Sequence, residues 1–202
     1  MARLVKIAIA GEGGQGVQAI GDVLAEAGNA AGKEALYIPN FGVEQRGGVS
    51  IAFVQISEEQ IGSPKFASGD IVIALSERAV ARTKQYVTKD TLFVYDSSLI
   101  TADTSNGDGK ASGVELPREA KQIIAIPATE VAKQELIPRV FNMIVLGATI
   151  RAAGIIAMQT IRGALEHKLG KKFVENPKLR ELNYQALDRG VELVEKALQE
   201  GR

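Results

Sequence analysis

The chain contains no cysteine and no tryptophan, and its only histidine is His167. Without cysteine, it cannot build a disulfide, a thiolate zinc site, a cysteine nucleophile or a cysteine-ligated iron–sulfur cluster from its own residues. A single histidine argues against a histidine metal site and against a Ser-His-Asp triad, and we interpret His167 as a surface side chain. The sequence therefore predicts a chain with no catalytic residue and no metal ligand of its own.

The chain also lacks an excess of charge of either sign. Lysine plus arginine number 24 and aspartate plus glutamate number 24, so the formal net charge is zero. A protein that binds nucleic acid by neutralising phosphates carries a basic excess, so no nucleic-acid partner is expected.

Long hydrophobic runs are absent as well. No apolar run reaches the roughly 18 residues that a membrane-spanning helix needs. The first apolar run, over residues 4–10, ends in glycines and lacks the longer stretch and cleavage site of a signal peptide. The sequence thus predicts a soluble, cytoplasmic protein with no membrane partner.

What remains is an ordinary globular composition, with 46% hydrophobic and 24% charged residues over 202 positions. This length favours a single domain over residues 1–202. Short apolar runs rich in branched residues predict buried strands. These runs lie at residues 4–10, 34–38, 49–56, 71–75, 92–95 and 122–126.

Helical spacing of apolar residues alternates with these runs and fills the last third of the chain. Helices are predicted over residues 17–31, 76–87, 128–136, 142–153, 159–169 and 179–198. Gly32 and Gly170 stand where glycines end helices, and residues 103–113 are turn-rich and predict a mobile loop or a hairpin tip. The predicted fold is α/β: a three-layer, Rossmann-like, mostly parallel sheet flanked by helices over 1–140, with a helical part over 141–202 packed on it.

A glycine-rich turn joins the first predicted strand to the first predicted helix. Gly11, Gly13 and Gly16 fit the pattern G-x-G-x-x-G, with Gly14 and Gln15 between them. Glycines permit a tight turn, and the free N–H groups of the following helix attract anions. Two interpretations stay open: a cradle for a phosphate or pyrophosphate, and a tight turn that serves only close packing.

Two features of nucleotide sites are missing around this turn. The second predicted strand ends in Ile-Pro-Asn at residues 38–40, where a dinucleotide site places an acidic residue for the ribose. Gly16 is followed by Val-Gln instead of the Lys-Ser/Thr of a phosphate loop. Neither NAD nor ATP binding is favoured. Gln15 is a polar amide placed to meet a ligand or a partner chain.

A second unusual stretch is Glu44-Gln45-Arg46-Gly47-Gly48. Its two glycines leave the Arg46 guanidinium free to bind a carboxylate or a phosphate. The plainer interpretation is a solvated loop in which Glu44 forms a salt bridge with Arg46. Taken alone, the stretch favours the plainer interpretation.

Three further residues have a structural interpretation beside a functional one. Ser76 follows a predicted strand at the edge where open α/β sheets bind ligands, and we interpret it as a helix N-cap. Asn142 is interpreted as an N-cap too, with a role at a subunit interface as the alternative. Gly147 lies inside a predicted helix, where glycine costs about 1 kcal/mol relative to alanine, and it indicates close packing of a helix or a partner.

Taken together, four stretches resemble the gamma subunit of 2-oxoacid:ferredoxin oxidoreductases. They are residues 11–16, residues 41–48 before a strand containing Ser50, residues 142–148, and the closing pattern over 165–189 with Asn183. The resemblance spans nearly the whole chain, in order. The positions that match residue by residue are Gly11, Gly13, Gly14, Gln15, Gly16, Arg46, Gly47, Gly48, Asn142 and Gly147.

The resemblance implies membership of a complex that oxidatively decarboxylates a 2-oxoacid, forms the acyl-coenzyme A thioester and reduces ferredoxin. It implies thiamine diphosphate on alpha and beta partner subunits, and iron–sulfur clusters in the beta subunit and in a ferredoxin-like delta subunit or domain. It associates the gamma subunit with subunit packing and coenzyme A access, without covalent chemistry of its own. The forms of the two loops lean toward 2-oxoglutarate, branched-chain 2-oxoacid or indolepyruvate relatives.

Two other functions stay open at this point. One is an independent Rossmann-type nucleotide-binding protein, and the other is a scaffold subunit that binds no small molecule. The sequence also leaves open the 2-oxoacid, the stoichiometry of the complex and a homodimer of the isolated chain.

Overall fold

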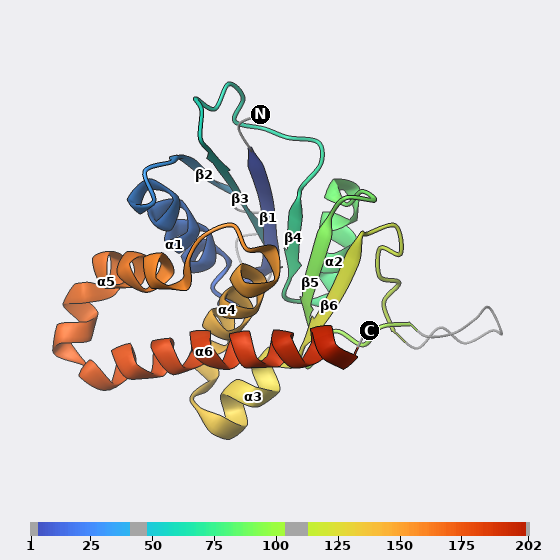
Figure 1. Ribbon diagram of the computed structural model, residues 1–202. Helices are drawn as coiled ribbons and strands as arrows, with labels where there is room; N and C mark the ends of the chain where they lie inside the picture. The colour runs from blue at the N-terminus through green and yellow to red at the C-terminus, as the bar shows by residue number, and fades with distance from the viewer. Residues whose placement is uncertain (1–3, 41–47, 104–112, 201–202) are drawn as a thin grey trace.

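The computed structural model describes residues 4–40, 48–103 and 113–200 (Figure 1). Its centre is a six-stranded sheet in the order β2-β3-β1-β4-β5-β6. The strands are β1 (Val5–Glu12), β2 (Glu34–Asn40), β3 (Val49–Ser57), β4 (Ile71–Ala74), β5 (Leu92–Asp96) and β6 (Gln122–Ile126). Every strand that the sequence predicts is present in this sheet.

The sheet is mostly parallel, as predicted, with one strand reversed. β1, β4, β5 and β6 are parallel neighbours, whereas β3 is antiparallel to both β1 and β2. β3 therefore lies between the first two strands, which a simple strand–helix–strand unit would place side by side. The chain reaches β2 through the first helix and then returns along β3 into the position beside β1.

Helices cover the two faces of the sheet unequally. One face, called here the helix-covered face, packs against α1 (Val17–Ala30), α3 (Ala128–Glu135), α4 (Phe141–Ala153), α5 (Met158–Glu175) and α6 (Pro177–Glu200). The other, called here the open face, packs against α2 (Glu77–Thr83), the 3-10 turn η1 (Lys84–Tyr86) and connecting segments. Figure 1 shows α4 and α6 on one side of the strands and α2 on the other.

Buried residues on both faces explain why the strands read as continuous apolar runs. Side chains alternate along a strand, so Ile7 and Ile9 of β1 enter the helix-covered core while Ala8 and Ala10 enter the core of the open face. These four side chains are fully buried. The three-layer arrangement therefore follows from the strand sequences themselves.

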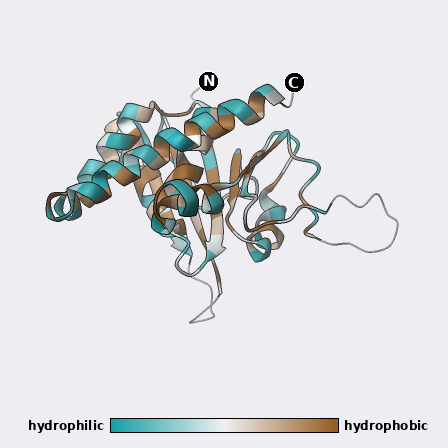
Figure 2. Cartoon of the chain, turned by 90° about the horizontal axis from the view of Figure 1, so that it is seen from below, coloured by the Kyte–Doolittle hydropathy of each residue, from teal (hydrophilic) through white to brown (hydrophobic). Residues whose placement is uncertain are grey.

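The C-terminal helices are held by one close helix crossing. A Cβ added to Gly147 of α4 would lie 2.2 Å from the Leu187 carbonyl oxygen of α6, and one added to Gly190 would lie 2.0 Å from the Ile144 carbonyl oxygen. The prediction that Gly147 marks close packing of a neighbouring helix is confirmed. Figure 2 shows α6 hydrophilic along its outer surface, so its apolar stripe faces α4 and the sheet.

Two predicted helix boundaries were wrong. Gly170 does not end α5, which continues to Glu175 and is capped at Asn176. An interior glycine costs only about 1 kcal/mol, and the buried Phe173 holds the last turn in place. The predicted helix over 76–87 divides into α2 and the 3-10 turn η1. Of the predicted loop over 103–113, residues 104–112 lie outside the described part of the chain.

None of the helices in the described ranges combines the length and hydrophobicity that crossing a bilayer requires.

Candidate functional site

The carboxyl end of β1 turns into α1 through the glycine-rich stretch. Gly14 has φ +90° and Gly16 has φ +78°, a left-handed conformation in which glycine is strongly favoured. Gly16 is the N-cap of α1, and no side chain caps the helix there or places a negative charge in its first turn. The start of α1 therefore offers backbone N–H groups and the positive end of the helix dipole.

Open space lies beside this turn. A Cβ added to Gly13 or to Gly14 would meet no atom within 4 Å. Gly11 differs, because its added Cβ would lie 2.8 Å from the Gln15 side-chain oxygen and 2.9 Å from Val17. Gly11 thus serves close packing, whereas Gly13 and Gly14 border a volume that a ligand can enter.

Gln15 is used inside the protein. Its Oε1 accepts a hydrogen bond from the Glu12 backbone N–H at 2.6 Å, and its Nε2 donates to the Leu75 carbonyl oxygen at 2.8 Å. The side chain therefore ties the end of β1 to the segment that follows β4. It holds the shape of the turn, in addition to any contact it makes with a ligand.

Asn142 lies against the turn from α4. The residue is only 8% exposed, and its amide nitrogen would be 2.3 Å from a Cβ added to Gly16. The N-cap interpretation of Asn142 is wrong, because the 3-10 turn η2 (Pro138–Val140) runs directly into α4, whose cap is Val140. Within the described residues the Asn142 amide has no hydrogen-bond partner.

The end of the second predicted loop lies close to the first. Glu44, Arg46 and Gly47 are outside the described residues, and Gly48 directly precedes β3. At the start of β3, Ser50 pairs with Gly11, and its hydroxyl donates to the Gly11 carbonyl oxygen at 3.4 Å. The chain that leaves Gly48 therefore reaches the glycine turn within two residues.

The remaining predicted site residues have structural roles. Ser76 caps α2, because its Oγ accepts a hydrogen bond from the Ala79 N–H at 3.2 Å, which confirms the interpretation favoured from the sequence. Gly147 lies at the crossing of α4 and α6 and not at the glycine turn. His167 is a surface side chain, 74% exposed, with Nδ1 2.8 Å from a Glu26 carboxylate oxygen.

Sequence reasoning missed two polar side chains near this edge. Asp96, fully buried at the end of β5, accepts hydrogen bonds from the Thr129 N–H and hydroxyl at 3.1 and 2.5 Å and so caps α3. Gln18, in the first turn of α1, accepts from the Tyr37 hydroxyl at 2.5 Å. Burial raises the pKa of Tyr37, which keeps that hydroxyl a donor. The Asp-Ser-Ser sequence after a strand was the available signal for Asp96.

The fold and this edge define an open α/β protein whose first helix begins at an exposed glycine turn, the place where such sheets bind ligands. The chain belongs to the pyruvate ferredoxin/flavodoxin oxidoreductase family, which it matches over residues 6–193. No group of three or more histidine, aspartate or glutamate side chains that could hold a metal ion occurs within the described residues.

Three similar proteins illustrate the range of this family. The ketoisovalerate oxidoreductase subunit VorA of Methanothermobacter thermautotrophicus is 32% identical over 190 residues, which are 93% of this chain and 36% of that protein. The gamma subunit of a keto/oxoacid ferredoxin oxidoreductase from Geobacter sulfurreducens is 26% identical with a TM-score of 0.74, covering 94% of this chain and 98% of that one.

The third is a 2-oxoglutarate:ferredoxin oxidoreductase from Magnetococcus marinus, solved with 2-oxoglutarate, coenzyme A and succinyl-CoA bound. It is 29% identical with a TM-score of 0.77, covering 96% of this chain and 31% of that one. The chain thus spans about a third of VorA and of the Magnetococcus chain, and nearly all of the Geobacter gamma subunit.

Proposed function

We propose that this chain is the gamma subunit of a 2-oxoacid:ferredoxin oxidoreductase complex. In that complex a 2-oxoacid and coenzyme A become an acyl-coenzyme A and carbon dioxide, and two electrons pass to ferredoxin. Support comes from the near-complete overlap with a separate gamma subunit and the partial overlap with longer relatives. The chain has no cysteine to ligate a cluster, so we place the iron–sulfur clusters and thiamine diphosphate on alpha, beta and delta partners.

Within this proposal, the glycine turn receives phosphates of coenzyme A. The observation that carries it is the combination of open space beside Gly13 and Gly14 with the Asn142 side chain, whose amide lies against Gly16 and forms no hydrogen bond to another described residue. Backbone N–H groups at the start of α1 and one amide N–H are suitable donors for phosphate oxygens. Arg46 and Gly47 belong to the proposed site on their sequence alone.

The role of the chain in the reaction is positional. Coenzyme A supplies the thiol that accepts the acyl group, and this chain's residues bind and orient the phosphate end of that molecule. Gln15 maintains the turn through its two backbone hydrogen bonds, and Asn142 adds a donor from a second element. The 2-oxoacid pocket lies on the partner subunits, and relatives of this chain act on ketoisovalerate or 2-oxoglutarate.

The experiment uses the assembled complex, recovered through a tag on this chain and checked by native mass spectrometry. Asn142→Leu removes the amide donor, and Gly13→Asp places a carboxylate where there is room for it. We expect each variant to assemble and to raise the KM for coenzyme A about tenfold, Asn142→Leu through the loss of one hydrogen bond to a charged group and Gly13→Asp through repulsion between its carboxylate and the phosphate. Gly163→Ala in α5 is the matched control, because its added Cβ also meets nothing within 4 Å.

Two results would redirect the proposal. Unchanged KM values in both variants would favour a scaffold subunit that binds no small molecule. Recovery of the chain alone, together with thermal stabilisation by NAD or FAD and none by coenzyme A, would favour an independent nucleotide-binding protein.

A further inference from the structure

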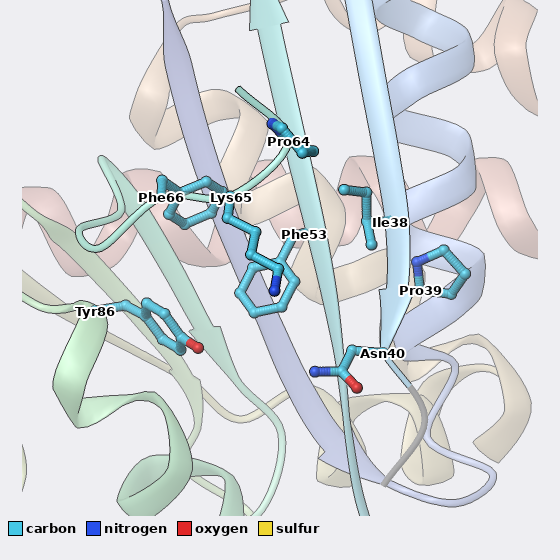
Figure 3. Close-up of a pocket in the computed structure, with 8 residues that line it drawn as sticks. All are labelled: Ile38, Pro39, Asn40, Phe53, Pro64, Lys65, Phe66 and Tyr86. Atoms are coloured by element: carbon cyan, nitrogen blue, oxygen red, sulfur yellow. The ribbon is translucent and has the colours of Figure 1, made fainter. Parts of the chain in front are cut away.

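The open face carries a pocket that the proposed function does not use. Its volume is about 400 Å³, within the range of small-molecule sites. The lining residues come from β2, β3, the segment after β3 and η1, and Figure 3 shows them around one hollow. They are Ile38, Pro39, Asn40, Phe53, Pro64, Lys65, Phe66 and Tyr86. The pocket lies across the sheet from α1 and the rest of the helix-covered face.

Three aromatic rings form one wall of this pocket. Phe53 lies edge-on to Phe66 at 87° and to Tyr86 at 74°, with ring centroids 5.4 Å apart in both pairs. Phe66 and Tyr86 are 6.1 Å apart at 72°. At these distances the rings fill the space between themselves, so they do not enclose a cation as an aromatic cage does. They offer instead a rigid, half-buried apolar corner against which a flat ring can pack.

The segment that carries Lys65 is fixed to the sheet. Gln55, only 3% exposed, donates from Nε2 to the Ser63 carbonyl oxygen at 2.7 Å. The Ser63 hydroxyl donates to the Lys65 carbonyl oxygen at 3.1 Å, and Pro64 restricts the backbone between them. The backbone of Lys65 is therefore held in place before any ligand arrives.

Three polar groups lie beside the aromatic corner. Figure 3 shows the Lys65 side chain extending across the pocket toward Phe53 and Asn40. Within the described residues, the Lys65 ammonium, the Asn40 amide and the Tyr86 hydroxyl form no hydrogen bond or ion pair. A cationic donor beside an apolar wall repels cations and selects a ligand that is flat at one end and negatively charged at the other.

We propose that this pocket binds a small molecule that has an aromatic or heteroaromatic ring and an anionic group. The ring packs on Phe53, Phe66 and Tyr86, and the anionic group accepts hydrogen bonds from Lys65 and Asn40. Two sources share this chemistry: the nucleotide half of a nucleotide cofactor, and an aryl-substituted organic acid. The inference goes beyond the coenzyme A proposal, since it rests on the other face of the sheet.

Calorimetric titration of the full chain tests this inference. The probes are adenosine 3′,5′-bisphosphate, phenylpyruvate and inorganic phosphate, at one salt concentration and in the Gly13→Asp background, which weakens any binding of a probe at the glycine turn. We expect one ring-bearing probe to bind at least tenfold more tightly than phosphate, and which probe it is identifies the source. Lys65→Met should weaken that binding about fivefold and Phe66→Leu by a similar factor. Lys178→Met, which removes a lysine charge from the surface of α6, should leave it unchanged.

The inference is overturned if neither ring-bearing probe binds more tightly than phosphate. It is equally overturned if Lys65→Met and Phe66→Leu bind the better probe as the parent does. A third contrary result is loss of partner subunits from the tagged complex on Phe66→Leu without any probe binding, because the pocket would then be a protein contact. The Lys65→Met and Phe66→Leu comparisons separate this test from the coenzyme A measurement, which reports on Gly13 and Asn142.

Discussion

The two faces of the sheet are built by different means. On the helix-covered face, five helices bury aliphatic side chains, and α4 and α6 approach until backbone meets backbone at Gly147 and Gly190. On the open face, one short helix, a 3-10 turn and connecting segments cover the strands, and a partly exposed aromatic corner remains. The closest backbone packing therefore lies on the helix-covered face, and the partly exposed aromatic pocket lies on the open face.

This difference separates two tasks in one small protein. The helix-covered core holds the strands in place, so that the glycine turn and the open face can present donors to a ligand. Asn142 connects the helix-covered core to the glycine turn, because it belongs to α4 and its side chain lies against Gly16. The predictions below test whether changes on the closely packed side cost more than changes on the open side.

The largest effect is expected at the helix crossing. Gly147→Ala places a Cβ 2.2 Å from the Leu187 carbonyl oxygen, so α4 and α6 must separate. Overpacking of this kind costs about 3 kcal/mol of unfolding free energy, measured by urea denaturation. Gly163→Ala is the control in a helix with open space, and it should be neutral or stabilising by up to about 1 kcal/mol. Equal effects of the two substitutions would contradict the close crossing.

The second largest loss of stability is expected at the glycine turn. Gln15→Leu removes hydrogen bonds to the Glu12 N–H and the Leu75 carbonyl, leaving two partly buried backbone groups without partners. The expected loss is about 2 kcal/mol. Hydrogen exchange should also quicken at Glu12 and not in β6. Unchanged exchange at Glu12 would mean that the side chain does not hold the turn.

A smaller effect is expected on the open face. Phe66→Ala removes a large ring, yet Phe66 is half-exposed and its neighbours can relax toward solvent. We expect a loss of about 1 kcal/mol, compared with about 3 kcal/mol for Leu146→Ala, which empties a fully buried position on α4. A loss for Phe66→Ala as large as that for Leu146→Ala would show that the open face is packed as closely as the other.

The smallest effect is expected from a surface ion pair. Arg189 donates to both carboxylate oxygens of Glu135, at 2.6 and 2.9 Å, and this hydrogen bonding lowers the pKa of Glu135 below its ordinary value of 4.5. The lowered pKa means that the stabilisation is complete above pH 4.5 and is lost as the pH falls through the folded-state pKa. Glu135→Gln should therefore lower the free energy of unfolding by less than about 1 kcal/mol at pH 7, and should not change it at a pH below the folded-state pKa of Glu135.

Urea unfolding of the parent and of Glu135→Gln, at pH 7 and in acid, measures this difference in the free energy of unfolding. Glu58→Gln is the control, because Glu58 lies 3.9 Å from Lys33 and forms a much looser pair. A Glu135→Gln cost that persists in acid would rule out the ion pair as its cause.

Much of this architecture could be predicted from local sequence patterns. Apolar strand runs, helical spacing and the glycine turn are short-range signals, and each appears where expected, including the N-cap at Ser76. The place of β3 between β1 and β2 could not be predicted, since no local pattern specifies which strand lies beside which. The N-cap of α4 was misplaced by two positions, at Asn142 instead of Val140, because a 3-10 turn merges with α4 at Phe141.

The pocket on the open face could not be predicted from the sequence for a related reason. Phe53, Phe66 and Tyr86 come from three separate elements at spacings that match neither a helix nor a strand. The use of Gln15 inside the turn was equally hidden, because its partner Leu75 lies 60 residues away in the sequence. Contacts between distant segments, rather than local conformation, are what the sequence left undetermined.

The reversed strand also constrains the order in which the protein can assemble during synthesis. Among the strands that the structure describes, β2 pairs with β3 alone, so a growing chain that has just produced β2 has no partner strand for it. β2 can join β1 in one sheet only after β3 has been synthesised and has paired with β1. β2 therefore gains its partner in the sheet only after the chain through Ser57 has left the ribosome, and not when the strand–helix–strand piece that precedes it is complete.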